Sequence, residues 1–386
     1  MNLILGTGPA PGPTSLPPLS AYVHIPWCVR KCPYCDFNSH TSDDALPEKA
    51  YVEALIADLE QELPAVRGRP LQSIFFGGGT PSLFSAQSIG RILEAMAARV
   101  PMATDIEITL EANPGTFEQA RFAEYRQAGV SRLSIGVQSF NSVHLERLGR
   151  IHDGDEALRA LKMARNAGFD NINLDLMHGL PGQTVEEALA DLQQALALEP
   201  EHLSWYQLTL EPNTVFYSRP PQLPEDDVLW DIQEEGQAVL RSGGFEQYEV
   251  SAYARNGRYS RHNLNYWQYG DFIGIGAGAH GKLSSSEGGI QRYWKTRLPR
   301  DYLAAQGSFR AGERRLDTGE IPFDFMMNAL RLTQGVPSRP LCRTHRPVTC
   351  GHRTPAGQGA GPRVARTLGA APARHRQRPA VSERSA

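Results

Sequence analysis

The sequence predicts an α/β protein built on a parallel sheet, because strand-like segments alternate with amphipathic stretches between about residues 20 and 210. The strand candidates are short, rich in β-branched or aromatic residues, and bounded by Gly, Pro or Asn. Six such β-α units in succession place the helices outside the sheet. They leave two architectures open, a doubly wound sheet and a partial barrel. The six candidates are Ala21–Pro26, Ser73–Gly77, Asp105–Glu111, Arg132–Gln138, Asn171–Met177 and Leu203–Leu210.

Apolar residues in the stretches between these strands recur at helical spacing. A stripe repeated every 3.6 residues can pack against a sheet while the opposite face meets water. These stretches are therefore predicted to be the outer helices. The two clearest series are Tyr51, Leu55, Leu59 and Leu63, and then Ala188, Leu189, Leu192, Ala195 and Leu196.

Residues 222–336 lack the alternation, and we expect them to form a smaller C-terminal α+β domain packed against the first. A flexible segment at residues 1–19 and the α/β domain at residues 20–221 precede it. The expected elements of the smaller domain are a helix near Glu225–Leu240, strand-like residues at Tyr248–Tyr253, a glycine-rich loop at Gly274–Gly281 and a helix near Asp324–Leu332.

Residues 337–386 differ from the rest in composition, with ten Arg, seven Pro and a single acidic residue, Glu383. They contain no Ile, Phe, Tyr, Trp, Met, Asn, Asp or Lys, so they are predicted to be a disordered basic tail. One interpretation is a polyanion-binding tail. We favour a shifted reading frame of a GC-rich gene, because the abundant residues have GC-rich codons. The domain before the tail would then be truncated, and Cys342 and Cys350 would have no functional role.

Composition restricts the remaining function classes. The net charge is −3, and because the tail carries +9, the other residues carry −12. An acidic body argues against general nucleic-acid binding. Residues 1–18 have no basic segment followed by a long apolar stretch, and no run reaches the roughly 18 apolar residues of a membrane span. We therefore expect a cytoplasmic protein, where thiols stay reduced and can bind metals.

The most informative residues are three cysteines, Cys28, Cys32 and Cys35, spaced as C-x3-C-x2-C without a nearby fourth. Three thiolates at this spacing suit a [4Fe-4S] cluster with one iron left open. A zinc site completed by His24 or His40 is the alternative, since closed zinc sites have four ligands. A disulfide set is disfavoured, because the chain has an odd number of cysteines, five.

The stretch from Tyr22 to His40, YVHIPWCVRKCPYCDFNSH, resembles the radical S-adenosylmethionine (radical SAM) enzymes. The closest branch holds oxygen-independent coproporphyrinogen III oxidase and the HemW-type heme chaperones. The resemblance implies a partial (β/α)6 TIM-like barrel, with the cysteine loop after its first strand. It also implies that the open iron binds the amino and carboxylate groups of S-adenosylmethionine, with Tyr22 and Tyr34 near that cofactor.

Further motifs follow the later strands, where function collects in parallel α/β folds. The segment Gly77-Gly78-Gly79-Thr80 lets backbone approach a ligand and leaves N–H groups for a carboxylate. The resemblance assigns Gly78, Gly79 and Thr80 to S-adenosylmethionine. Polar residues at the same rim match cofactor-binding positions of the family, with carboxylates for ribose and an arginine for the ligand carboxylate. They are Glu111, Gln138, Arg150 and Asp175, while Thr209 and His280 match less well.

Two features separate the branches of the family. The oxidases carry a fourth cysteine two residues after the third, where this chain has Phe37. The segment His262-Asn263-Leu264-Asn265-Tyr266-Trp267 resembles the H-N-x-x-Y-W hallmark of the chaperones, and an imidazole is a common heme ligand. We therefore expect a HemW-type chaperone that binds a [4Fe-4S] cluster, S-adenosylmethionine and heme, with His262 helping to hold the heme.

This expectation includes partners. The chaperone would deliver heme to an acceptor such as a respiratory heme protein, and transient membrane association and a homodimer are compatible with it. Two alternatives stay open from sequence. One is an oxygen-independent coproporphyrinogen III oxidase, and the other is a zinc-stabilised barrel without radical chemistry.

Overall fold

The computed structural model describes residues 16–41, 45–115, 119–285 and 289–336. The predictions for the tail, including those for Cys342 and Cys350, lie outside these residues, as does most of the expected N-terminal segment. The described chain is organised around a twelve-stranded sheet with the order β14-β13-β12-β11-β1-β4-β5-β6-β7-β8-β10-β9. A separate two-stranded parallel sheet joins β2 (Trp27–Cys28) to β3 (His40–Thr41).

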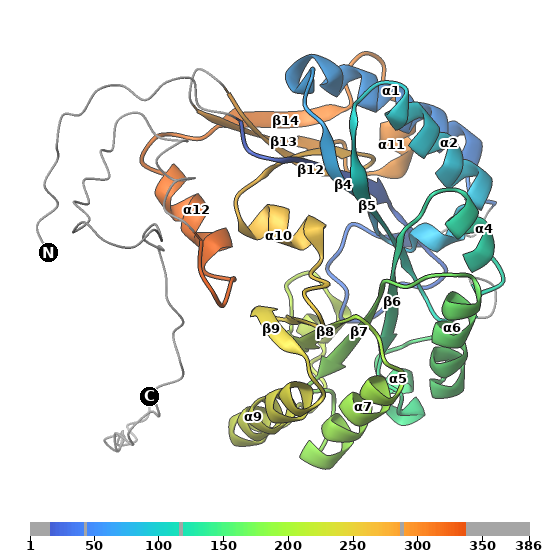
Figure 1. The fold of residues 1–386 in the computed structure, drawn as a ribbon, viewed down its shortest axis with the longest axis vertical. Coiled ribbons are helices and arrows are strands. Elements are labelled where there is room, and N and C mark those ends of the chain that lie inside the picture. Colours follow the sequence, from blue (N-terminus) through green and yellow to red (C-terminus); the bar gives the residue numbers. More distant parts are fainter. Residues whose placement is uncertain (1–15, 42–44, 116–118, 286–288, 337–386) are drawn as a thin grey trace, which may run out of the picture.

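Six central strands run parallel in sequence order and confirm the predicted α/β architecture. The sheet curves into an open arc with helices on its convex side, which is the partial barrel rather than the doubly wound alternative (Figure 1). All six predicted strands are present, and β6 has the predicted bounds. The strands are β1 (Leu19–Ile25), β4 (Leu71–Gly78), β5 (Met102–Ala112), β6 (Arg132–Gln138), β7 (Ile172–His178) and β8 (His202–Gln207).

The helices of the convex side follow from the predicted apolar stripes and from clear start signals. Thr184 and Glu187 form a capping box at the start of α7 (Val185–Ala197), and Asp153 with Glu156 does the same for α6 (Gly154–Asn166). These reciprocal bonds satisfy amide groups that a helix start leaves open. The other outer helices are α1 (Glu48–Val66), α2 (Ala86–Ala97), α4 (Phe122–Gln127) and α5 (Ser142–Arg147), and a short 3-10 turn, η1 (Pro81–Leu83), precedes α2.

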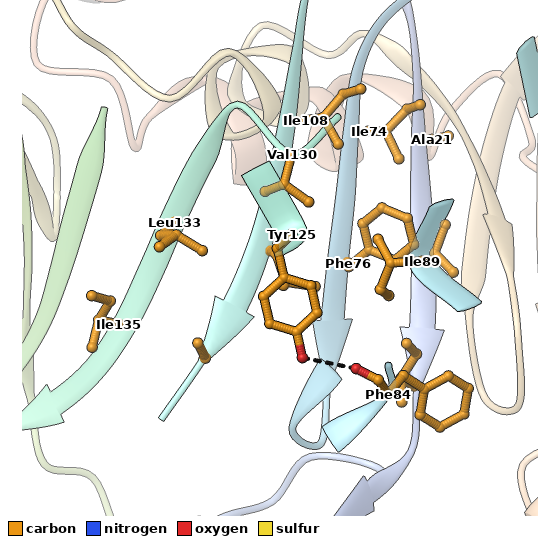
Figure 2. Packing of buried hydrophobic residues seen from close by; sticks show 14 of the residues in the cluster. Ala21, Ile74, Phe76, Phe84, Ile89, Ile108, Tyr125, Val130, Leu133 and Ile135 are labelled. Atoms are coloured by element: carbon orange, nitrogen blue, oxygen red, sulfur yellow. Dashed lines mark hydrogen bonds between the residues drawn. The ribbon is translucent and has the colours of Figure 1, made fainter. Parts of the chain in front are cut away.

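The hydrophobic core lies between these helices and the convex face of the sheet (Figure 2). Alternate strand residues such as Ile74 and Phe76 are fully buried there against Ile89 of α2. Burial of a large apolar side chain contributes about 1.5–3 kcal/mol. The hydroxyl of buried Tyr125 donates to the carbonyl oxygens of Ser82 and Phe84, which fixes the chain between β4 and α2.

Residues beyond 222 extend the same sheet at both ends. Beside β1, β11 (Asp271–Ile275) pairs in parallel and is followed by the antiparallel strands β12 (His280–Ser284), β13 (Ile290–Lys295) and β14 (Arg310–Arg315). At the other end, β10 (Ala252–Ala254) and β9 (Glu246–Glu249) join β8. The sheet is thus continuous across residue 221, and the domain boundary placed there stays a prediction.

Two of the later helices lie in different places relative to the sheet. Beside α7 lies α9 (Asp226–Ser242), close to its predicted bounds. By contrast, α10 (Arg261–Trp267) lies within the concave side of the arc (Figure 1). The others are α8 (Val215–Ser218), α11 (Pro299–Leu303) and α12 (Ile321–Ala329). None of the helices in the described ranges is long and apolar enough to cross a membrane.

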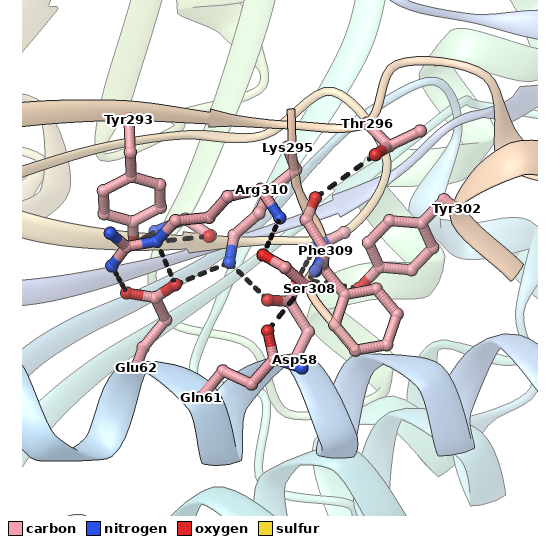
Figure 3. Close-up of polar contacts among 12 residues, drawn as sticks. Asp58, Gln61, Glu62, Tyr293, Lys295, Thr296, Tyr302, Ser308, Phe309 and Arg310 are labelled. Carbon is pink, nitrogen blue, oxygen red and sulfur yellow. Dashed lines mark hydrogen bonds and ion pairs between the residues drawn. The ribbon is translucent and has the colours of Figure 1, made fainter. Parts of the chain in front are cut away.

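A buried ionic cluster joins the late strands to the first helix (Figure 3). Lys295 of β13 pairs with Asp58 and Glu62 of α1, and all three side chains have no exposed surface. Arg310 of β14 adds a bond from its Nη2 to Glu62 Oε2 of 2.5 Å, and the Tyr302 hydroxyl donates to Asp58 Oδ2 at 2.8 Å. The cluster therefore fastens β13 and β14 to the helix that precedes β4.

Candidate functional site

A cavity of about 370 Å³ opens where the parallel strands end at their carboxyl termini. All three cysteines of the C-x3-C-x2-C motif line it, and so do most of the polar residues predicted at the rim. We call it the cysteine cavity. Of the residues predicted for the cluster and S-adenosylmethionine, those found in its lining are Cys28, Cys32, Tyr34, Cys35, Gly78, Gly79, Thr80, Glu111, Gln138, Arg150 and Asp175, and Thr209 is also there.

The cysteine loop leaves β1 and is held by local bonds before β3. The Cys35 amide donates to the Cys32 carbonyl oxygen at 3.2 Å. The Lys31 ammonium donates to the carbonyl oxygens of Phe37 and Ser39, both at 3.2 Å. These bonds close the loop on itself, so the spacing in sequence brings the three thiols to one wall of the cavity.

The thiols have polar neighbours that suit their ionised form. Thr80 Oγ1 donates to Cys28 Sγ at 3.5 Å, and the Arg150 guanidinium donates from Nη1 to Cys32 Sγ at 3.6 Å. Burial, together with the neighbouring thiols, raises the pKa of Cys28 and of Cys35. Deprotonation on binding a positively charged iron site would therefore release protons.

The glycine-rich turn after β4 packs tightly against the cysteine loop. Gly78 has φ of +117°, and a Cβ there would lie 2.4 Å from the His24 ring. A Cβ on Gly79 would lie 2.5 Å from the Trp27 carbonyl oxygen, so both positions require glycine. The N–H groups predicted to be free in this turn are not free at Gly79 and Thr80, whose amides donate to the carbonyl oxygens of Ile25 and Trp27.

Two carboxyl groups, Glu111 at the end of β5 and Asp175 on β7, meet at the wall of the cavity. Glu111 Oε2 accepts the Gly78 amide at 3.2 Å, and Asp175 accepts the Ser134 hydroxyl at 3.0 Å. Burial, with the nearby Asp175 charge, raises the pKa of Glu111 to about 8. Burial also raises the pKa of Asp175. Neither carboxyl has an ion-pair partner among the described residues, so a cationic ligand would stabilise both.

Asn113 was missed from sequence, although it lies in the L-E-A-N-P segment that pointed to Glu111. Its side-chain oxygen accepts Arg150 Nη2 at 2.6 Å, and its nitrogen donates to Thr80 Oγ1 at 3.1 Å. It thus positions two residues that contact cysteine sulfurs. Gln138 is left-handed, with φ of 68°, at an irregular register between β6 and β7. Such strain at a site residue is typical of functional positions.

A second cavity of about 500 Å³ adjoins the first, since Phe37, Gly78 and Glu111 line both. We call it the aromatic cavity, because five aromatic residues line it: Tyr22, Phe37, Tyr266, Phe272 and Trp294. The structure places Tyr22 and His280 here rather than in the cysteine cavity. The assignment of Tyr22 to S-adenosylmethionine stays a prediction.

His262 lies inside the barrel, at the start of α10, with 4% of its surface exposed. Its ring stacks on Phe75 at 4.5 Å between centroids and meets the edge of Tyr266 at 4.6 Å. Burial lowers the pKa of His262 to about 3, so the imidazole is neutral. Heme ligation by His262 stays a prediction.

The donor set can be tested against the two metal sites that the sequence left open. Of the two rings proposed to complete a zinc site, His24 has both nitrogens engaged and His40 has Nε2 engaged. Tyr22 Oη and the Asn38 carbonyl oxygen each lie 2.9 Å from a His24 nitrogen, and His40 Nε2 lies 3.1 Å from Asn38 Oδ1. In the described ranges, no three His, Cys, Asp or Glu side chains converge as ligands of a single ion. Three thiols that face one cavity suit a cluster that takes one thiolate per iron.

Comparisons with known proteins agree with this geometry. The model of the radical SAM superfamily matches residues 22–195. Heme chaperone HemW of Escherichia coli K12 is 55% identical over 322 residues, 83% of this chain and 85% of that protein. The mouse protein named radical S-adenosyl methionine domain-containing protein 1, mitochondrial, is 40% identical over 85% of this chain and 77% of its own length.

Among solved structures, coproporphyrinogen III oxidase (HemN) of Escherichia coli has a TM-score of 0.73. The match covers 85% of this chain and 79% of that one. At 24% identity, this likeness concerns the fold alone. This likeness in fold agrees with the partial barrel and with the antiparallel strands at both ends of its sheet.

Proposed function

We propose that this chain is a heme chaperone, because it belongs to the HemW family of the radical SAM superfamily. It would bind heme and transfer it to an acceptor heme protein, carrying a [4Fe-4S] cluster and S-adenosylmethionine. One observation carries the proposal beyond the family name: the cysteine cavity and the aromatic cavity share three wall residues. A flat aromatic cargo can therefore lie beside the cofactor site.

The cofactor residues are assigned by their place in the cysteine cavity. Cys28, Cys32 and Cys35 would hold the cluster, which supplies an electron when it is bound. Thr80 and Arg150 donate to two of those sulfurs and so favour the thiolates.

The charges of the remaining rim fit S-adenosylmethionine, which carries a sulfonium and an ammonium group. Glu111 and Asp175 are carboxyl groups without a cationic partner in the described part of the chain. They would accept hydrogen bonds from the ligand, while Gly78, Gly79 and Gln138 shape the wall. The bound cation would lower the raised pKa of Glu111 and keep this carboxylate ionised.

Phe37 bears on the choice between chaperone and oxidase. It stands where the oxidases carry a fourth cysteine, and 61% of its surface is exposed. Its ring lines both cavities. An apolar ring at this junction offers contact area to a porphyrin face and no sulfur for chemistry.

Anaerobic purification of the full chain, followed by heme titration and a coproporphyrinogen III decarboxylation assay, tests the proposal. We expect a Soret band that saturates with heme, transfer of that heme to an apo-acceptor, and no decarboxylation. Cys32→Ala should lower the iron content and the broad visible absorption of the cluster. Reductive turnover of coproporphyrinogen III, or the absence of heme binding with an intact cluster, would overturn the proposal.

A further inference from the structure

Building on the proposed heme-chaperone function, we propose that the aromatic cavity is the heme site, with His280 as the axial ligand of the iron. Arg297 faces a propionate of the same heme. The proposal rests on the lining of the cavity, on the surroundings of its histidines and on an unpaired cation at its edge.

The shape and lining of the cavity suit a porphyrin. Its volume of about 500 Å³ is within the range of cofactor sites, roughly 300–1,000 Å³. Phe37 and Trp294 on its wall are 61% and 37% exposed, so their rings are open to a ligand. Flat aromatic rings gain contact area and stacking energy from a flat aromatic ligand.

The surroundings of the histidines single out His280. It begins β12 and pairs across the strands with Trp294, so the two side chains share one face. It is exposed, and no residue in the described ranges hydrogen-bonds its ring. His24 also lines the cavity, but both its nitrogens are engaged, and His262 is buried behind Phe75 and Tyr266. Burial lowers the pKa of His280, which favours the neutral, iron-binding imidazole.

The cavity also has a cation for the charged edge of heme. Arg297 is exposed, donates from Nε to Asn38 Oδ1 at 3.2 Å, and forms no ion pair with a described residue. Lys295 lines the cavity too, but its charge is compensated by Asp58 and Glu62. A guanidinium without a carboxylate partner is suited to bind a propionate.

The test compares His280→Ala with His262→Ala in the full chain, purified anaerobically with equal cluster content. Heme affinity and the position of the Soret band are measured for each, with and without added imidazole. We expect His280→Ala to lose about tenfold in affinity and to shift the Soret band, since an axial ligand is removed. Imidazole should restore the wild-type spectrum in that variant.

Arg297→Gln and Arg300→Gln form a matched pair for the propionate contact. Arg300 is 82% exposed at the side chain and pairs with Asp301 outside the cavity. Arg297→Gln should weaken heme binding by roughly two- to fivefold, as expected for an exposed ion pair. The Arg300 variant should bind as the wild type does.

The possible outcomes distinguish failure of the His280 assignment from failure of the proposed heme-chaperone function. If the wild type binds no heme, the chaperone function fails. If the wild type binds heme and His280→Ala keeps both affinity and spectrum, the function stands and the His280 assignment is wrong. A Soret shift with weaker heme binding in His262→Ala alone would transfer the ligand role from His280 to His262 in α10.

Discussion

Two regions of this molecule withdraw a pair of carboxyl groups from solvent, and they differ in what surrounds the pair. On the convex side, Asp58 and Glu62 are fully buried and bonded to Lys295, Tyr302 and Arg310 (Figure 3). On the concave side, Glu111 and Asp175 accept neutral donors only. Both regions raise the cost of charge by burial, but among the described residues only the first pairs its carboxylates directly with cations.

This difference in ion pairing indicates which of the two regions binds a ligand. A buried ion pair that is complete holds elements together and has no capacity left for a partner. Carboxyl groups recessed in a cavity without an ion-pair partner are costly in the free protein, and a positively charged ligand relieves that cost. The ion-paired carboxylates Asp58 and Glu62 therefore belong to a structural region. The carboxyl groups without ion pairs, Glu111 and Asp175, belong to the ligand site.

The largest effect is expected at the complete cluster. Lys295→Met would leave Asp58 and the Glu62–Arg310 pair without the central cation, so we expect about 3–5 kcal/mol of destabilisation. Denaturant unfolding at constant cluster content measures it. Arg300→Met, which breaks an exposed pair, is the control and should cost about 1 kcal/mol or less. Equal losses in the two variants would erase the contrast between buried and exposed pairs.

Glu111→Gln should affect binding and stability in opposite directions. S-adenosylmethionine affinity should fall about tenfold or more, because a charge-assisted contact contributes about 1.5–3 kcal/mol. The pKa of Glu111 is raised, so the folded state binds more protons than the unfolded state between its ordinary value and about 8. Its unfavourable contribution is absent at acidic pH and grows as the pH rises through that window.

The stability part is measured on the ligand-free protein at pH 5 and pH 9. The variant should unfold at a higher temperature than the wild type at pH 9, by roughly 2–4 °C for each kcal/mol gained. At pH 5 the two should nearly coincide. A larger gain at pH 5 than at pH 9 would contradict the raised pKa.

The smallest effect is expected at Asn113, which touches no ligand in this assignment. Asn113→Ala removes one bond to Arg150 and one to Thr80, each worth about 1 kcal/mol. The cluster should assemble, while S-adenosylmethionine affinity falls by roughly threefold to tenfold. Iron content checks cluster assembly, and titration with S-adenosylmethionine checks the affinity. Loss of the cluster in this variant would make Asn113 a structural residue of the cysteine loop.

Sequence patterns predicted the parts of this fold that depend on local signals. The spacing of apolar residues predicted the central strands and the outer helices. Ile74 and Phe76, for example, alternate along β4 and are buried against α2. The cysteines were found by their C-x3-C-x2-C spacing, and the rim residues by their resemblance to family positions at the carboxyl ends of the predicted strands. The pairing of β11 with β1 was not foreseen, since about 250 residues separate the two strands and no local pattern reports it.

The misses have a similar cause. The H-N-x-x-Y-W segment has polar and aromatic residues on all sides, so it does not show the one-sided stripe of a surface helix, yet it forms α10 within the arc. The glycine-rich turn was expected to have free amides, but those of Gly79 and Thr80 donate to the carbonyl oxygens of Ile25 in β1 and Trp27 in β2. The position of α10 and the partners of these amides both depend on tertiary contacts. The spacing of residues in the sequence does not encode such contacts.

The hydrogen bonds of Asn38 link the cysteine loop to residues that are synthesised much later. Besides holding Arg297 through its side-chain oxygen, Asn38 donates from its side-chain nitrogen to the carbonyl oxygens of Ala277 and Arg297, both at 2.9 Å. The cysteine loop is made early by the ribosome, but its anchors are made 239 and 259 residues later. The contacts cannot form before those residues have been synthesised. Cluster assembly on a fully supported loop is therefore a step that follows translation of nearly the whole described chain.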